Sequence, residues 1–239
     1  MLSSKGENKI IHTAAMLYES VKPWSWKKHL QRYNSLETVE LLLKHNGIEL
    51  DSKSFRVDSF CGFLFIDELG SSIVVNENHI PSRKLFTIAH ELGHFYLHKE
   101  IQSEFFEKGL KEEVYSYSEK IMERQANLFA SELLIPIEVL KHMLSLRFSF
   151  VRISKTIGVS IEALKWRIHR YLQVDFNINY KFALLLTNEY IQRSFDGNYE
   201  ESCIFVMSHN KYIQLEIYQE LIGNESFIEN YRVNLEPIF

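Results

Sequence analysis

The chain has 239 residues, of which 46% are hydrophobic and 24% charged, and this composition is ordinary for a globular protein. A chain of this length is expected to fold into one or two domains and to bury well over half of its unfolded surface. Its net charge of −4 argues against a protein that binds polyanions over its whole surface.

The cysteines and the N-terminus indicate a soluble cytoplasmic protein. Cys61 and Cys203 lie far apart and fit no metal-ligand spacing, so we expect them to be thiols of a reducing compartment. The N-terminus is polar and lacks the apolar core of a signal peptide. The apolar run at 61–66 is far too short to span a bilayer.

The first third of the chain predicts two helices, over 8–21 and 36–46, because apolar residues recur there at helical spacing. Trp24 and Trp26 follow the first helix. We expect this pair to pack on the core, and the alternative is a contact patch with the lysines beside it.

Three strand-like runs come next, at 55–60, 61–66 and 72–75. They predict a small antiparallel sheet. An exposed sheet edge can bind an extended peptide as an added strand, and residues 72–76 are our candidate for that edge.

A helix is predicted to begin at Pro81 and Ser82, with Ser82 as its N-cap. It contains His90-Glu91-x-x-His94, and 3.6 residues per turn place the two histidines on the same side. Apolar side chains occupy an arc of roughly 120° on the opposite side. These are Leu85, Ile88, Ala89, Leu92, Phe95 and Tyr96.

The residue types in this motif suit a catalytic zinc ion. Neutral imidazoles bind zinc at about 2.0–2.1 Å, and a catalytic zinc keeps one position open for water. The ion lowers the pKa of that water towards about 7, and Glu91 would take its proton as a general base.

A third ligand is needed, and the sequence offers His98 or Glu123. His98 lies about 12 Å along the helix axis from His90, with no glycine to bend the chain between them. We therefore expect His98 at the helix end or outside the site. Glu123 could complete a His₂Glu set of metal ligands. Asn127, one turn away, could orient one of these ligands through a hydrogen bond without binding the metal itself. The alternative places Glu123 on a solvated helix face.

The helix that carries Glu123 is predicted to begin at Ser116, because Ser116-x-x-Glu119 matches a capping box, and to end near Pro136. The intervening segment 99–113 is acidic. We expect it to be a surface loop; the alternative is a lid, or an acidic lip that attracts a basic substrate.

Two segments together closely resemble the ImmA/IrrE family of zinc metallopeptidases: RxxFTIAHELGHxxLH at 83–98 and ExxANxFAxxLLxP at 123–136. The resemblance covers residues 45–136 well and the following helices loosely. It implies His90, His94 and Glu123 as zinc ligands and Glu91 as catalytic base. Members of this family typically cut or inactivate helix-turn-helix repressors of the Xre type, which switches on mobile-element or stress-response genes.

Residues 137–173 predict three short helices, over 137–146, 149–157 and 160–171, with Gly158 at a helix-turn-helix-like bend. Seven basic residues against two glutamates give this segment a net charge of +5, which leaves −9 for the rest of the chain. The segment could contact DNA, or it could pack on the peptidase domain and dock the substrate.

Residues 174–239 contain four apolar or alternating runs, at 182–187, 202–207, 211–218 and 226–233. They predict a small mixed or β-rich accessory unit that could sense a signal, dimerise or cover the substrate groove. His209 is expected in an exposed turn.

The sequence therefore predicts an α+β protein with three parts. Residues 1–136 form a zincin-like metallopeptidase domain, 137–173 a helix-turn-helix-like segment and 174–239 an accessory domain. The leading hypothesis is a zinc endopeptidase that cleaves a helix-turn-helix repressor. The rival is a regulatory protein that binds a repressor or DNA without proteolysis.

Overall fold

A computed structural model describes residues 4–22, 29–57, 59–102, 104–106, 116–207, 217 and 221. The chain divides into two compact units. One contains Met1–Pro136 together with Ile157–Ser160 and Phe239, and the other contains Ile137–Thr156 and Ile161–Ile238. Trp24, Trp26 and His209 lie outside the described residues. Within those residues, no helix is long and apolar enough to cross a membrane.

The first unit contains a four-stranded sheet in the order β1-β3-β2-β4. Its strands are β1 (Ile48–Lys53), β2 (Gly62–Asp67), β3 (Gly70–Asn76) and β4 (Glu104–Phe106). Strand β1 pairs with β3 in parallel and the other pairs are antiparallel, so the sheet is mixed and not antiparallel as predicted. The parallel pair was missed because five of the six β1 residues are exposed, which leaves no alternating pattern to read.

Two further expectations about this sheet are wrong. Residues 72–76 belong to β3, which is an interior strand, so the edges of the sheet are β1 and β4. The described residues of 55–60 form no strand. Strand β4 arises inside the segment 99–113 that was expected to be a loop, and most of the rest of that segment lies outside the described residues.

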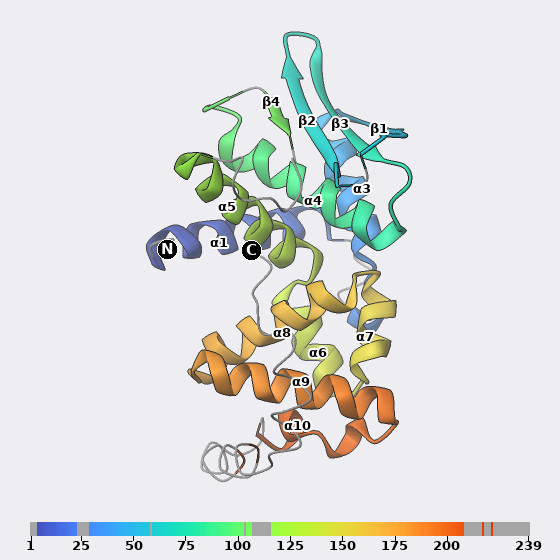
Figure 1. The fold of residues 1–239 in the computed structure, drawn as a ribbon, viewed down its shortest axis with the longest axis vertical. Coiled ribbons are helices and arrows are strands. Elements are labelled where there is room, and N and C mark those ends of the chain that lie inside the picture. The colour runs from blue at the N-terminus through green and yellow to red at the C-terminus, as the bar shows by residue number, and fades with distance from the viewer. Residues whose placement is uncertain are drawn as a thin grey trace. The chain divides into compact units, whose positions relative to one another are not determined.

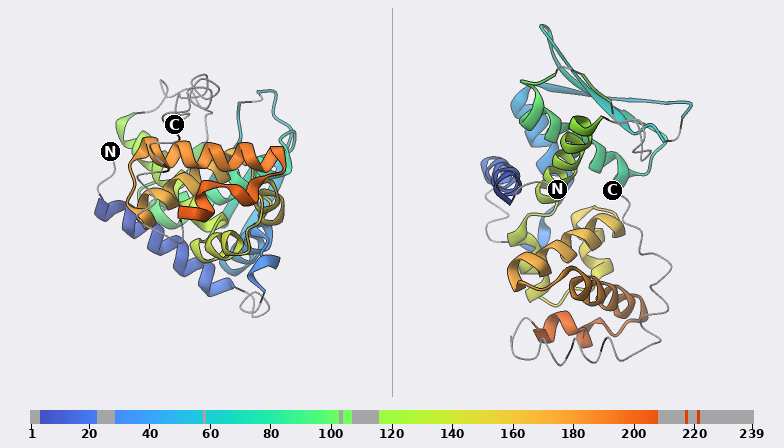
Figure 2. Two further views of the ribbon diagram at one scale, coloured as in Figure 1. Left: turned by 90° about the horizontal axis from the view of Figure 1, so that it is seen from below. Right: turned by 60° about the vertical axis from the view of Figure 1, so that its left-hand side comes forward.

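The helices of the first unit are α1 (Ser4–Val21), the short 3₁₀ helix η1 (Leu30–Arg32), α3 (Ser35–Asn46), α4 (Pro81–His98) and α5 (Tyr117–Leu134). Helices α3 and α4 pack on one face of the sheet (Figures 1 and 2). Helix α4 begins at Pro81 with Ile80 as its N-cap, so Ser82 is not the cap. Proline is favoured at the first helical position because its φ is fixed and it has no N–H to satisfy.

Helix α5 begins with the predicted capping box. The Ser116 hydroxyl accepts a hydrogen bond from the Glu119 backbone N–H, and the Glu119 carboxylate accepts one from the Ser116 N–H. At the other end, the buried Tyr33 hydroxyl contacts the carbonyl oxygens of Leu133 and Leu134 at 3.3 and 3.0 Å. A side chain thereby satisfies carbonyls that a helix end leaves without an intrahelical partner.

Helices α4 and α5 lie side by side at unusually short range (Figure 1). A Cβ atom added at Gly93 would lie 3.0 Å from the Ala126 Cα, 3.2 Å from its carbonyl oxygen and 3.2 Å from the Phe129 ring. A side chain at this crossing point would require α5 to shift by a few tenths of an ångström. Gly93 therefore allows the close approach of the helix that carries His90 and His94 to the helix that carries Glu123.

All the regular secondary structure described in the second unit is helical. It contains α6 (Ile137–Ser145), α7 (Phe150–Ile157), α8 (Ile161–Phe176), α9 (Tyr180–Asp196), the 3₁₀ helix η3 (Tyr199–Glu201) and α10 (Cys203–Met207). Gly158, between α7 and α8, has a φ of +88°, a backbone conformation that glycine adopts without strain.

The predicted β-rich character of residues 174–239 is wrong where it can be checked. Residues 182–187 lie in α9, and 203–207 form α10. A short continuous apolar run is consistent with a buried strand or a buried helix, and residues 182–190 are all buried. The runs at 211–218 and 226–233 lie outside the described residues, apart from Ile217.

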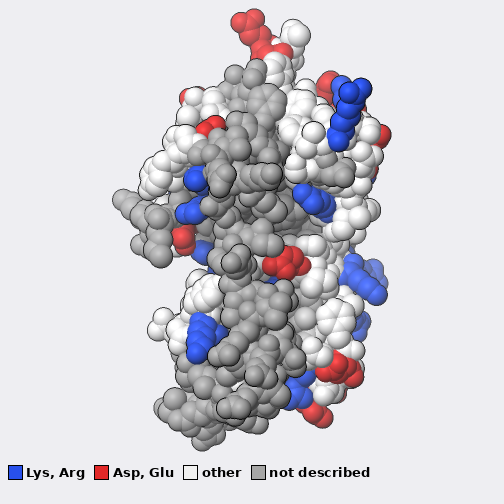
Figure 3. Space-filling model, viewed as in Figure 1, with Lys and Arg blue, Asp and Glu red and all other residues white. Residues whose placement is uncertain are grey.

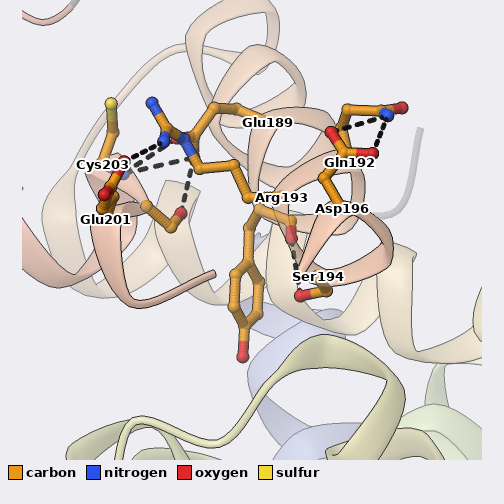
Figure 4. Close-up of polar contacts among 9 residues, drawn as sticks. Glu189, Gln192, Arg193, Ser194, Asp196, Glu201 and Cys203 are labelled. Atoms are coloured by element: carbon orange, nitrogen blue, oxygen red, sulfur yellow. Dashed lines mark hydrogen bonds and ion pairs between the residues drawn. The ribbon is translucent and has the colours of Figure 1, made fainter. Parts of the chain in front are cut away.

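A buried carboxylate on α9 connects this helix with η3 and α10 (Figure 4). Glu189 on α9 is 1% exposed and accepts hydrogen bonds from the Arg193 guanidinium, the Ser202 hydroxyl and the Cys203 backbone N–H. Arg193 also contacts Glu201 at 3.1 Å. This network fastens η3 and the start of α10 to α9.

Candidate metal centre

Helix α4 places His90, Glu91 and His94 in a fully enclosed position. The exposed fractions of these residues are 1%, 0% and 1%. The sequence predicted a helix with one buried and one open side, but α4 is buried almost all round from Leu85 to Phe95. The motif is covered because α5 packs against it and because β4 lies over His94.

Helix α5 brings the Glu123 carboxylate to both histidines. The Glu123 Oε2 lies 3.1 Å from the His90 Nε2, the Glu123 Oε1 lies 3.4 Å from the His94 Nε2, and the two Nε2 atoms are 3.0 Å apart. Ligands about 2.0–2.1 Å from one zinc ion at tetrahedral angles are separated by roughly 3.3 Å. The three observed distances agree with that spacing.

Asn127, one turn after Glu123 on α5, orients His90. Its Oδ1 lies 2.9 Å from the His90 Nδ1. An amide oxygen can only accept, so this contact favours the His90 tautomer with its proton on Nδ1 and its Nε2 lone pair directed towards Glu123 and His94. This is the tautomer in which Nε2 can bind a metal.

His94 is enclosed by residues that the sequence did not assign to the site. The Phe105 ring on β4 stacks on its imidazole with centroids 4.5 Å apart. Its Nδ1 lies 3.0 Å from the Nδ1 of His98, and the Nε2 of His98 lies 2.8 Å from the Oε1 of Gln125. No sequence spacing connects Phe105 or Gln125 to the motif, so only tertiary packing shows their involvement.

The expectation that His98 lies at the helix end or outside the site is half right. It is the last residue of α4, but it is 2% exposed and contacts His94 directly. Among the described residues, the group whose atoms could hold a metal ion consists of His90, His94 and Glu123, all within 4.8 Å of one another, and His98 is not part of it.

The protonation states in this cluster suit metal binding. Burial lowers the pKa of His94 to about 4, so its imidazole is neutral at pH 7. Burial alone would raise the pKa of Glu123, but its contacts with His90 and His94 outweigh that effect and lower the pKa to about 2. Neutral imidazole and ionised carboxylate are the forms that bind metals.

Comparison with known proteins places this chain in a family. The model of the IrrE N-terminal-like domain, peptidase family M78, matches residues 44–169. The chain belongs to the ImmA/IrrE family. The match is more than half of the chain and includes α4 and α5, and the family is one of metallopeptidases.

Relatives of this ImmA/IrrE protein extend the comparison. The chain is 33% identical over 101 residues to the uncharacterized immunity region protein 2 of Bacillus phage phi105, an alignment that covers 42% of this chain and 61% of the phage protein. A Mycobacterium tuberculosis transcriptional regulator resembles it structurally with a TM-score of 0.47 at 15% identity, over 67% of this chain and 46% of the regulator.

Proposed function

We propose that this protein is a zinc-dependent endopeptidase that cleaves a helix-turn-helix transcriptional repressor of the Xre type. The observation that carries the proposal is the convergence of His90, His94 and Glu123 from two helices onto one point. Membership of a metallopeptidase family supports the reaction class. The repressor as substrate rests on the family resemblance.

The residues of the cluster fit a zinc ion. The Glu123 carboxylate is ionised and the His94 imidazole is neutral, and the His90 Nε2, the His94 Nε2 and the Glu123 carboxylate oxygens lie 3.0–3.4 Å apart. Two imidazoles and a carboxylate at this spacing can share one cation. We therefore assign His90, His94 and Glu123 as zinc ligands.

Glu91 is the catalytic base in this proposal. It follows His90 directly on α4 and is fully buried, where a carboxylate interacts more strongly with nearby charge than it would in water. His90, His94 and Glu123 would hold a zinc ion that supplies Lewis-acid chemistry at the scissile carbonyl. Glu91 would take the proton from the attacking water and pass it to the amine that leaves.

The direct test uses the purified full chain, loaded with zinc, and the helix-turn-helix repressor encoded by the neighbouring gene. We expect the repressor to be cut at a discrete bond, which the masses of the two fragments identify. A repressor that stays intact under these conditions, while zinc is bound, would reject the proposed substrate.

The rival function is DNA or repressor binding through residues 137–173 without proteolysis. Of the cations in this segment, Arg167 is only 3% exposed and is therefore out of reach of DNA. Lys141 and Arg152 are exposed, Lys141 pairs with Asp175, and the Arg152 guanidinium lies 3.6 Å from the centre of the Phe148 ring. On the face drawn in Figure 3, the described basic and acidic residues are scattered and form no patch of a single sign.

Operator binding separates the two functions. We expect the full chain to bind operator and unrelated DNA equally weakly at 150 mM salt. Operator-specific binding with a steep salt dependence would favour the rival, because each phosphate contact releases counterions. The same protein preparation is used in both assays, so loss of fold affects both readouts.

A further inference from the structure

We propose that Gln125 and His98 form a hydrogen-bonded relay that fixes the proton of His94 on Nδ1, so that the His94 Nε2 faces the metal position as a lone pair. His98 and Gln125 are therefore positioning residues that act through His94. The proposal deepens the zinc site described above and rests on it.

Gln125, His98 and His94 form a continuous series of side-chain contacts. The Gln125 Oε1 lies 2.8 Å from the His98 Nε2, and the His98 Nδ1 lies 3.0 Å from the His94 Nδ1. Both distances are those of ordinary hydrogen bonds. The far nitrogen of His94, Nε2, lies 3.0 Å from the His90 Nε2 and 3.4 Å from the Glu123 Oε1.

The donor-to-acceptor direction of these hydrogen bonds follows from Gln125. The Gln125 Oε1 has no proton to donate, so the His98 Nε2 carries one and donates it. A neutral imidazole has a single N–H, so the His98 Nδ1 is then an acceptor. The neighbouring His94 Nδ1 must donate to it, which leaves the His94 Nε2 without a proton.

The opposite direction is incompatible with metal binding. If the Gln125 amide presented its N–H₂ group to His98, the His98 Nδ1 would donate to His94. The His94 Nε2 would then carry the proton and could not bind zinc. The orientation of one amide on α5 thus decides whether a ligand on α4 is available.

Burial makes the relay effective. His98 and His94 are 2% and 1% exposed, and the Phe105 ring lies over both, with centroid distances of 4.5 Å to His94 and 6.2 Å to His98. Water has little access to substitute for a missing partner. Helix α5 in this arrangement supplies a ligand, Glu123, and one orienting side chain for each histidine, Asn127 for His90 and Gln125 for His94.

Three variants test the relay through zinc affinity. Gln125→Leu removes the acceptor and keeps the approximate size of the side chain, whereas Gln125→Glu keeps an acceptor that cannot donate when ionised. Gln192→Leu makes the same change at an exposed glutamine of α9 that also loses an amide hydrogen bond (Figure 4). Gln125 is only half-buried, so these variants are expected to fold.

Zinc affinity is measured by chelator competition on each full-length variant. Loss of a partner that orients a metal ligand typically reduces affinity 10–100-fold. We expect about that loss in Gln125→Leu, and wild-type affinity within a factor of about three in Gln125→Glu and Gln192→Leu. Equal affinity in Gln125→Leu and wild type, or equal losses in Gln125→Leu and Gln125→Glu, would overturn the relay.

A second readout does not require metal. Nitrogen-15 spectra of the metal-free full chain distinguish the two neutral imidazole tautomers. We expect the proton on Nε2 in His98 and on Nδ1 in His94, and a mixture of His94 tautomers in Gln125→Leu. A proton on the His98 Nδ1 in the wild type would contradict the relay. Absence of zinc binding by the wild type would instead reject the proposed function, and these spectra would still decide the relay.

Discussion

At the scale of single residues, the candidate metal centre brings a carboxylate and two imidazoles together in a largely enclosed position. The His90 and His94 imidazoles are each 1% exposed, and the Glu123 carboxylate that meets them is partly exposed. Burying such groups costs free energy unless a cation or hydrogen bonds compensate. His90, His94 and Glu123 are buried together in spite of this cost, and such clusters of buried titratable groups are typical of functional sites.

Replacement of the proposed base separates metal binding from chemistry. Glu91→Gln keeps the size of the side chain and removes its ability to take a proton. We expect one bound zinc per chain, as in the wild type, and a loss of cleavage rate of about 10²–10⁴-fold, the range for general-base catalysis. Metal content and fragment formation are measured together.

Glu40→Gln is the matched control for that variant, because Glu40 is exposed on α3. It is expected to cleave at the wild-type rate. Full activity in Glu91→Gln would show that another group takes the proton.

The pKa of His94 predicts how the metal-free protein responds to acid. Burial lowers this pKa from 6.5 to about 4, so between these values the unfolded chain binds a proton that the folded chain does not. The free energy of unfolding should therefore fall as the pH falls from 6.5 to 4. Glu123 adds to the loss below pH 4.5, because its lowered pKa of about 2 favours the folded state only while the carboxylate is ionised.

Denaturant unfolding in the presence of a chelator, at pH 7.0, 5.5 and 4.5, measures this dependence. A His94→Gln variant lacks the titrating group and should show a shallower decline. Identical slopes for the two proteins would mean that His94 does not resist protonation in the folded state.

At the scale of helices and strands, the close crossing of α4 and α5 is what builds the site. Gly93 allows the approach, Ala126 and Phe129 form the opposing surface, and Glu123 then reaches both histidines. Substitution at the crossing point should therefore affect both stability and metal binding, although residue 93 itself binds nothing.

Gly93→Ala tests this role. Alanine favours a helix over glycine by about 1 kcal/mol, but overpacking a filled contact costs roughly 1–3 kcal/mol. Since the added Cβ would lie 3.0 Å from backbone of α5, which cannot rotate away, we expect a net loss of unfolding free energy and weaker zinc binding. Chemical denaturation and chelator competition measure the two effects; a variant more stable than wild type would show that the helices can separate without cost.

The elements that could be predicted from the sequence are those with local signals. The capping box at Ser116 and the His90-Glu91-x-x-His94 spacing both depend on neighbours within one turn, and α4 and α5 were found. Strand β1 pairs with residues about 23 positions away and is mostly exposed, so its sequence shows no pattern. The helix α9 was mistaken for a strand because its buried apolar run has no visible period.

The same reasoning explains what was missed in the site. Gln125 and Phe105 contact His98 and His94 only because α5 and β4 fold against α4. Neither residue type is diagnostic of a metal site. The assignment of Glu123 from the sequence relied on the family resemblance, since spacing alone left a solvated helix face as an equal alternative.

At the scale of the whole molecule, the protein consists of two compact units, and the candidate metal centre belongs entirely to the first. The second unit is held by its own buried contacts, including the Glu189 network. A repressor-docking role for 137–173 and an accessory role for 174–239 remain our proposals for this unit.

Metal removal should reduce the stability of the full chain. A ligand that binds only the folded state stabilises it by about 2.7 kcal/mol when present at 100 times its dissociation constant. We expect the thermal midpoint of the wild type to fall when a chelator removes zinc. Glu123→Gln lacks the anionic ligand and should show a much smaller zinc-dependent shift; an equal shift in both proteins would place zinc elsewhere.

X-ray absorption at the zinc edge, on the purified full-length protein, tests the central claim most directly. We predict one zinc ion per chain, coordinated by two imidazole nitrogens at about 2.0–2.1 Å with the remaining ligands oxygen. A protein that retains no zinc after purification in zinc-containing buffer, or a spectrum without the signature of two imidazoles, would contradict the assignment of His90, His94 and Glu123 and the proteolysis that depends on it.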